Sequence, residues 1–206
     1  MLFSGSRILL VGPHPDDIEY GCGGTVAKYS GPNEVFSVIF APCLEDPLNA
    51  GILEEHEKAM RLLGAKEIMK QKLPRDKLEL HSQEIRDILY GLKIKFDPQV
   101  VMCPSLGDLH QDHNVVGNCC LTVFRDTATL LGYEITRSTK DFSPTLFVQL
   151  SEGDMQKKLQ ALKFYRTQYR RSYFKPSAFK ALAIVRGCQV NAKYAEAFEI
   201  MRMIDR

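Results

Sequence analysis

Short apolar runs alternate along this chain with longer stretches whose apolar residues recur at helical spacing, and this alternation limits the fold most. The runs that predict strands are residues 7–11, 34–41, 67–73, 99–103, 145–150 and 181–186. The stretches that predict helices are residues 25–29, 53–63, 81–94, 114–127, 154–169 and 192–204. Strands that alternate with helices indicate a Rossmann-like α/β fold, in which a mostly parallel sheet carries helices on both faces.

The size and composition of the chain fit one such domain spanning residues 1–206. A chain of 206 residues can bury one sizeable core. Its net charge of +2 gives no electrostatic reason to expect nucleic acid or an acidic membrane as a partner. No apolar run approaches the roughly 18 residues that a membrane-spanning helix needs. The oligomeric state is left open, and a homo-oligomer is compatible with the sequence.

The cysteines argue against one kind of metal site. None of the six forms a C-x-x-C pair, so a cysteine-ligated zinc site is not indicated. The first residues lack the basic-then-apolar pattern of a signal peptide. We therefore expect free thiols in a cytoplasmic protein.

Two clusters of histidine and aspartate follow two of the predicted strands. Residues 13–17 read Pro-His-Pro-Asp-Asp and come directly after the first strand. Residues 108–113 read Asp-Leu-His-Gln-Asp-His and follow the strand at 99–103. Ligands of open α/β sheets bind at the carboxyl ends of the strands, so both clusters are expected at one edge of the sheet.

These residue types suit a hydrolytic metal site. A catalytic zinc ion usually has three ligands from histidine or carboxylate side chains, and a nearby carboxylate takes the proton of the attacking water. Because Pro15 keeps its neighbours extended, His14 and Asp17 can face one ion while Asp16 faces the substrate. His113 would complete the ligand set from the second cluster. His110 would lie close by, with Asp112 placed to orient it.

The two clusters resemble the motifs of the LmbE-like (PIG-L type) N-acetylglucosaminyl deacetylases. The family's first motif, (Ala/Pro)-His-Pro-Asp-Asp, matches residues 13–17, and its second, His-x-Asp-His, matches residues 110–113. Further similar segments are the glycines at 21, 23 and 24, and residues 132–134, 165–171, 186–187 and 194–198. The resemblance extends from residue 8 to about residue 201, which is nearly the whole chain.

The resemblance implies a metal-dependent N-deacetylase that removes acetate from an N-acetylated sugar, with a nucleotide or lipid carrier left open. It implies that His14, Asp17 and His113 bind zinc, with Fe²⁺ or another divalent ion as the alternative. It also implies that Asp16 is the general base.

The same resemblance implies that His110, held by Asp112, is a protonated group that stabilises the oxyanion and protonates the leaving amine. One departure concerns the loop 43–52, where many relatives carry an arginine and this chain has Ile52. Substrate contacts in that loop are therefore open.

Other interpretations stand beside this one. The protein could hydrolyse another acyl amide, or it could be a non-catalytic sugar-binding relative that keeps the metal site. The glycines at 21–24 lack the G-x-G-x-x-G spacing of a dinucleotide site. We expect a solvated helix face, or alternatively a face toward an anionic substrate, for the basic residues Lys157, Lys158, Lys163, Arg166, Arg170 and Arg171. We expect His56 and His81 at the surface, and structural roles for Tyr194 and Glu196.

Overall fold

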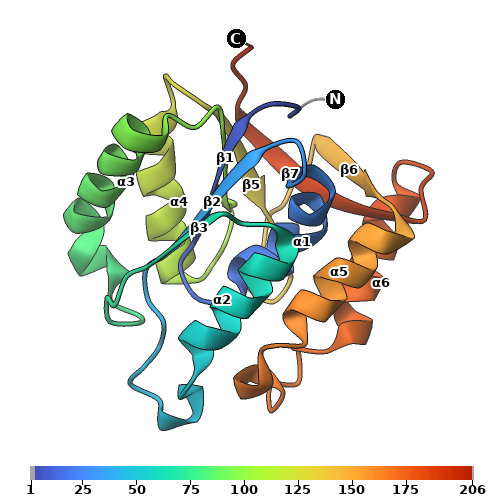
Figure 1. Ribbon diagram of the computed structural model, residues 1–206, viewed down its shortest axis with the longest axis horizontal. Coiled ribbons are helices and arrows are strands. Elements are labelled where there is room, and N and C mark those ends of the chain that lie inside the picture. Colours follow the sequence, from blue (N-terminus) through green and yellow to red (C-terminus); the bar gives the residue numbers. More distant parts are fainter. Residues whose placement is uncertain (1–2, 206) are drawn as a thin grey trace.

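A seven-stranded sheet in the order β3-β2-β1-β4-β5-β7-β6 forms the centre of the protein (Figure 1). The computed structural model describes residues 3–205. The strands are β1 (Arg7–Gly12), β2 (Glu34–Ile39), β3 (Glu67–Lys70), β4 (Val100–Pro104), β5 (Thr129–Tyr133), β6 (Leu146–Leu150) and β7 (Tyr194–Arg202). Strands β1 to β5 are parallel, whereas β7 runs antiparallel to both of its neighbours. The predicted mostly parallel α/β fold is confirmed.

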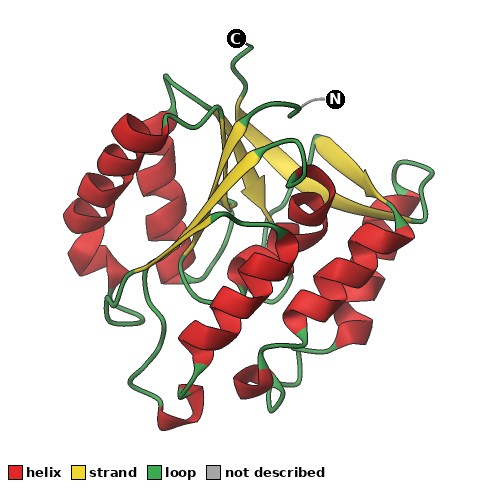
Figure 2. Cartoon of the chain, in the orientation of Figure 1, coloured by secondary structure: helices red, strands yellow, loops and turns green. Residues whose placement is uncertain are grey.

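Helices cover both faces of this sheet (Figure 2). They are α1 (Asp17–Tyr29), α2 (Ile52–Leu63), α3 (Ser82–Phe96), α4 (Gln111–Phe124), α5 (Glu152–Leu162) and α6 (Pro176–Cys188). Short 3₁₀ turns are η1 (Pro47–Asn49), η2 (Leu78–His81) and η3 (Arg166–Gln168). Helices α3 and α4 pack on one face, and α1, α2 and α5 lie on the other (Figure 1). Within residues 3–205, no helix has the length and apolar character needed to cross a membrane.

The buried strand β1 shows how the sequence builds two cores. Successive side chains of a strand point to opposite faces of the sheet. Ile8 and Leu10 join the core beneath α1, α2 and α5, whereas Leu9 and Val11 join the core beneath α3 and α4. A strand that is covered on both faces is therefore apolar over its buried positions, as this one is from Ile8 to Val11.

The strand order places the predicted site at a change of direction in the sheet. From β1 the chain passes through α1 to β2 on one side, while β4 lies on the other side of β1. Such a switch point opens a crevice at the carboxyl ends of the two central strands. The loops that carry residues 13–16 and 105–110 both leave the sheet at this crevice.

Helix α1 approaches the sheet very closely, and glycines make this possible. A Cβ atom on Gly21 would lie 2.3 Å from the Tyr133 ring, and one on Gly24 would lie 2.4 Å from Leu150. The expectation that the helix begins at residue 25, after these glycines, was wrong. The helix begins at Asp17 and is kinked at Cys22, whose φ of −138° is not helical.

The C-terminal third of the chain differs most from the sequence-based prediction. Residues 181–186 lie in α6 and not in a strand, and residues 192–204 contain β7 and not a helix. Strand β5 was missed altogether. The alanine, glutamate and methionine residues of β7 favour a helix, but pairing with both β5 and β6 outweighs that preference.

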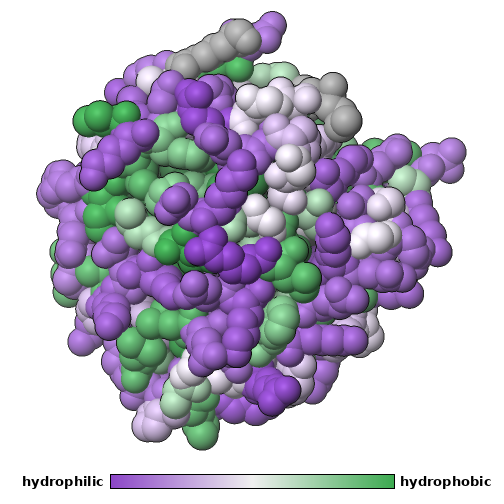
Figure 3. Space-filling model, viewed as in Figure 1, coloured by the Kyte–Doolittle hydropathy of each residue, from purple (hydrophilic) through white to green (hydrophobic). Residues whose placement is uncertain are grey.

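The basic residues near α5 do not all lie on a solvated face. The sequence predicted a solvated helix face for all six. Hydrophilic side chains predominate over α5 in the space-filling view (Figure 3). However, the helix ends at Leu162, and Lys158 is only 2% exposed. Its ammonium group bonds to Glu196, which is also buried. The solvated-face interpretation is therefore wrong for Lys158.

Candidate active site

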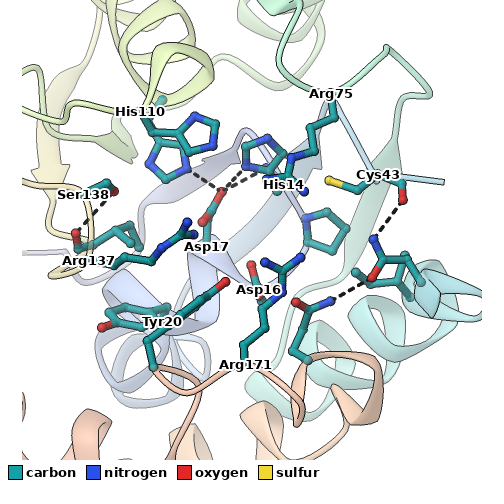
Figure 4. Close-up of a pocket in the computed structure, with 17 residues that line it drawn as sticks. His14, Asp16, Asp17, Tyr20, Cys43, Arg75, His110, Arg137, Ser138 and Arg171 are labelled. Atoms are coloured by element: carbon teal, nitrogen blue, oxygen red, sulfur yellow. Dashed lines mark hydrogen bonds and ion pairs between the residues drawn. The ribbon is translucent and has the colours of Figure 1, made fainter. Parts of the chain in front are cut away.

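The two His/Asp clusters meet in one pocket at the carboxyl ends of β1 and β4 (Figure 4). His14, Asp16 and Asp17 enter it from the β1–α1 connection. His110 and His113 enter it from the start of α4. The convergence expected from two separate sequence motifs is thus present in the structure.

The Asp17 carboxylate lies between two imidazoles. Its Oδ2 atom is 3.2 Å from His14 Nδ1 and 3.4 Å from His113 Nε2. The opposite nitrogen of each ring is held by a further carboxylate. His14 Nε2 lies 3.0 Å from Asp112 Oδ2, and His113 Nδ1 lies 2.8 Å from Asp108 Oδ2.

This arrangement fits a divalent metal ion. Histidines that ligate a metal usually donate their other N–H to a carboxylate, which fixes the ring and its tautomer. His14 and His113 both meet this condition. Ligand atoms of His14, His110 and His113 also lie within 4.8 Å of one another. The nitrogen and oxygen donors suit zinc and neighbouring transition metals.

The titration behaviour reflects the crowding of these groups. Burial alone would lower the pKa of His113, but Asp17 and Asp108 outweigh it and raise the pKa to about 10. The pKa of His14 is also raised, because Asp112 and Asp17 outweigh burial. Burial opposes ionisation of Asp17, yet the two imidazoles hold its pKa well below its ordinary value. Positive charge is thus favoured on both sides of Asp17.

Asp112 does not hold His110 through its side chain, contrary to expectation. Its carboxylate binds His14 and accepts hydrogen bonds from the backbone N–H groups of Asp76 and Leu78, at 2.8 and 3.2 Å. The link to His110 runs through the backbone, since the Asp112 N–H donates to His110 Nδ1 at 3.2 Å. His110 is the N-cap of α4. Asp112 therefore holds the ring of His14, one of the expected metal ligands, which sequence spacing did not reveal.

The surroundings of His110 favour its neutral form over the cation that the resemblance implies. Burial, together with the His113 and His14 imidazoles, lowers the pKa of His110 to about 4. Its ring stacks on that of His113 with centroids 4.5 Å apart. Because Nδ1 accepts the cap hydrogen bond, the neutral ring carries its proton on Nε2.

Asp16 has a strained backbone that a buried network supports. It caps α1 in the left-handed region with a φ of 90°, which is uncommon outside glycine and often marks functional sites. Its N–H donates to the Tyr165 hydroxyl at 3.1 Å, and that hydroxyl donates to Glu19 at 2.6 Å. His56 Nδ1 lies 2.9 Å from the same hydroxyl. The expectation that His56 lies at the surface was wrong, because it is completely buried.

The side chain of Asp16 lines the pocket, and its surroundings oppose ionisation of the carboxyl group. Burial and the charges of Asp17 and Glu19 raise the pKa of Asp16 well above its ordinary value, and Arg171 acts in the opposite direction. Among residues 3–205, no side chain donates a hydrogen bond to its carboxylate. A carboxylate in this state is suited to accept and release a proton.

The remaining walls of the pocket come from loops. Ile52, at the position where many relatives carry arginine, lines the wall together with Cys43 and Asn49. Three arginines, at 75, 137 and 171, line it as well. Arg171 ends the similar segment 165–171 and belongs to the basic run for which an anionic substrate was the alternative. The other two were missed, because they come from loops far apart in sequence and belong to no recognisable motif.

Comparison with known proteins identifies the family. The profile of the PIG-L family, described as GlcNAc-PI de-N-acetylase, matches residues 9–124, more than half of the chain. This chain belongs to the PIG-L family. It is therefore a member of a family of N-deacetylases, which are hydrolases of amide bonds, and the resemblance found in the sequence is confirmed. The matched segment contains both His/Asp clusters.

Individual proteins are also similar to this chain. The uncharacterized deacetylase YaiS of Escherichia coli K12 is 26% identical over 168 residues, covering 78% of this chain and 90% of YaiS. The conserved protein TT1542 of Thermus thermophilus superposes with a TM-score of 0.79 at 23% identity, covering 98% and 97% of the two chains. The N,N′-diacetylchitobiose deacetylase of Pyrococcus horikoshii gives a TM-score of 0.78 at 23% identity, covering 95% and 84%. The two structural matches show that the fold is shared.

Proposed function

We propose that this protein is a divalent-metal-dependent deacetylase that hydrolyses the acetamide of an N-acetylated amino sugar. The observation that carries the proposal is the position of Asp17 between two imidazoles whose far nitrogens are held by buried carboxylates. The whole chain, residues 1–206, would act as one deacetylase domain. Its cysteines are all unpaired, which suits a reducing compartment such as the cytoplasm.

His14, Asp17 and His113 would hold the ion, with Zn²⁺ as the first candidate and Fe²⁺ as the alternative. When bound, such an ion supplies Lewis acidity, which polarises the acetyl carbonyl and acidifies a water molecule. Asp112 and Asp108 fix the two histidine rings that face it. These carboxylates act through the ligands and do not touch the substrate.

Asp16 would take the proton of the attacking water. Its carboxylate faces the pocket next to Asp17, and the Tyr165 hydrogen bond holds its backbone in place (Figure 4). As the water oxygen bonds to the acetyl carbon, its proton passes to the Asp16 carboxylate, and negative charge develops on the former carbonyl oxygen.

His110 would stabilise that oxygen as a neutral hydrogen-bond donor. The cap occupies Nδ1, while Nε2 lies 3.8 Å from Asp76 Oδ1 and has no hydrogen-bond partner among residues 3–205, so its N–H would be available to a substrate in the pocket that His110 lines. A donor fixed before the reaction stabilises the developing charge without reorganisation. When the tetrahedral species collapses, the carbon–nitrogen bond breaks and Asp16 returns its proton to the departing amine. The products are acetate and the free amino sugar.

The direct test is release of acetate and amine from a panel of N-acetylated sugars, including free, nucleotide-linked and lipid-linked N-acetylglucosamine and N,N′-diacetylchitobiose. We expect equimolar products from at least one substrate, with activity lost on metal removal and restored by Zn²⁺ or Fe²⁺. N-propionyl glucosamine in the same panel tests the alternative acyl specificity. Sugar binding without turnover by the metal-loaded protein would instead identify a non-catalytic relative.

A further inference from the structure

Three guanidinium groups surround the reactive end of the pocket. Arg75 lies between β3 and η2, Arg137 follows β5, and Arg171 follows η3. Their side chains enter the pocket from different sides (Figure 4). Asp16 and Asp17 are the carboxylates that line the same pocket. If Asp17 is engaged by imidazoles and metal, the pocket holds more positive charge than its own acids can balance.

Two of these guanidinium groups lack the partners that arginines find elsewhere in the protein. Arg170 pairs with Asp46 at 2.6 Å, and Arg186 pairs with Glu134 at 2.6 Å. Within residues 3–205, Arg137 and Arg171 form no ion pair with a carboxylate. A guanidinium group has five donors, and it seldom stays unmatched next to buried surface.

Buried N–H groups without acceptors point in the same direction. The Nε atoms of Arg75 and Arg171 are buried and have no hydrogen-bond partner in the part of the chain that the structure describes. Arg75 Nε does lie 3.3 Å from the Asp76 carboxylate, but without hydrogen-bond geometry. An unsatisfied buried donor is unfavourable, so acceptor oxygens of a ligand would be stabilised at this position.

Tyr173 places two of the cations near each other. The Arg137 guanidinium lies 4.6 Å from the centre of the Tyr173 ring, and that of Arg171 lies 6.0 Å from it. Contact with an aromatic face fixes a guanidinium while leaving its N–H edge available. Two like charges held around one ring repel each other, and an anion between them would remove that repulsion.

We propose that Arg137 and Arg171, with Arg75 on the opposite wall, form a subsite for an anionic group carried by the N-acetylated sugar. This inference rests on the proposed deacetylase function and specifies its substrate class as a sugar bearing a phosphate or a carboxylate. Both groups present oxygens that match the planar guanidinium fork. A neutral sugar would leave these donors unmatched.

The test compares neutral and anionic sugars with the zinc-loaded enzyme. Its substrates are N-acetylglucosamine, its 1-phosphate and 6-phosphate, and N-acetylmuramic acid, which separate phosphate from carboxylate and one position from another. We expect kcat/KM to be at least about 10-fold higher for one of the anionic sugars. Arg137→Gln and Arg171→Gln should each reduce the ratio of anionic to neutral kcat/KM by roughly 10-fold, a typical effect of losing a charge-assisted hydrogen bond.

Arg166→Gln is the matched control, because Arg166 is an exposed arginine of η3 that does not line the pocket. It should leave the ratio unchanged. Equal kcat/KM for neutral and anionic sugars would overturn the subsite while leaving the deacetylase function intact. A preference that persists in the Arg137→Gln/Arg171→Gln double variant would also overturn it, because the anion would then bind elsewhere, for example to the metal.

A binding measurement keeps the inference testable if none of the sugars is deacetylated. Calorimetry of the zinc-loaded protein with glucosamine, its 1-phosphate and 6-phosphate, muramic acid and inorganic phosphate reports the subsite without turnover. Binding that depends on the phosphate or the carboxylate and is lost in the double variant supports the anion subsite even if the reaction differs from the one proposed. Equal binding of glucosamine and of all three anionic sugars overturns it.

Discussion

Two clusters of buried charge contact helix α1, and they differ in how completely their charges are satisfied. In the first, Lys158 Nζ bonds to Glu196 at 2.5 Å and to the Tyr20 carbonyl at 2.6 Å. The Glu196 carboxylate also accepts the N–H groups of Gly24 and Thr25, at 2.9 and 2.6 Å. These N–H groups follow the kink in α1, so Glu196 caps the second half of the helix.

In the second cluster, which lies in the pocket, protein groups do not satisfy all the charges in this way. Asp17 faces two imidazoles that balance it only when they carry protons, and Asp16 faces the pocket. Arg137 and Arg171 stand beside them without carboxylate partners among residues 3–205. A buried charge whose partners are all protein groups stabilises the fold, whereas charges that face a common cavity indicate a site for ligands. The following predictions test whether this difference separates structure from catalysis.

The largest effect is expected from the three proposed metal ligands. His14→Ala, Asp17→Ala and His113→Ala should each weaken metal binding by more than about 100-fold, since even supporting residues contribute 10- to 100-fold. Activity should be lost with the metal. Elemental analysis after dialysis against a metal buffer measures the occupancy. His110→Ala should keep its metal, and loss of metal from this variant would make His110 a ligand in a three-imidazole site.

Asp16→Asn separates metal binding from chemistry. The amide keeps the shape of the side chain but cannot accept the proton of water, so turnover should fall by roughly 10²- to 10⁴-fold. Metal content and the melting temperature should remain close to those of the unaltered protein. Single-turnover rates at saturating zinc provide the measurement. Near-normal turnover would mean that another group activates the water.

A smaller effect is expected from the carboxylates behind the histidines. Asp112→Asn and Asp108→Asn remove the negative charge that holds one imidazole each, and metal affinity should fall by about 10- to 100-fold. Competition with a chromophoric chelator measures this affinity. If Asp112→Asn alters kcat at full metal occupancy and leaves affinity unchanged, then Asp112 acts through His110 after all.

The parts of the site that the sequence predicted are those governed by local rules. Parallel strands bring their carboxyl ends to one edge, so clusters following β1 and β4 had to meet there. Each cluster lies within a few residues of a strand, and small errors in strand boundaries did not move it. His14, Asp16, Asp17, His110 and His113 therefore lie together as expected.

The parts that the sequence did not predict depend on contacts between distant segments. Asp112 lies two residues from His110, but its carboxylate binds His14, 98 residues away. His56 looks like a surface residue on an amphipathic helix, yet it is enclosed where Tyr165 and Glu19 meet it. Similarly, the helix-favouring composition of β7 is outweighed by pairing with strands on both sides, which no local pattern reveals.

The smallest effect on catalysis is expected from the cluster of Lys158 and Glu196, where the stability of the fold should change instead. Lys158→Met and Glu196→Gln each leave a buried charge without its partner, and removing one partner of a buried pair typically costs about 3–5 kcal/mol. The double variant should recover part of this loss, because no unpaired charge remains. Urea denaturation at a fixed zinc concentration measures the stability, and kcat per folded molecule should stay close to that of the unaltered enzyme. A fall in kcat comparable to that of Asp16→Asn, with stability unchanged, would mean that this cluster also serves the reaction. Complete pairing of buried charges by protein groups would then not distinguish structural from catalytic residues.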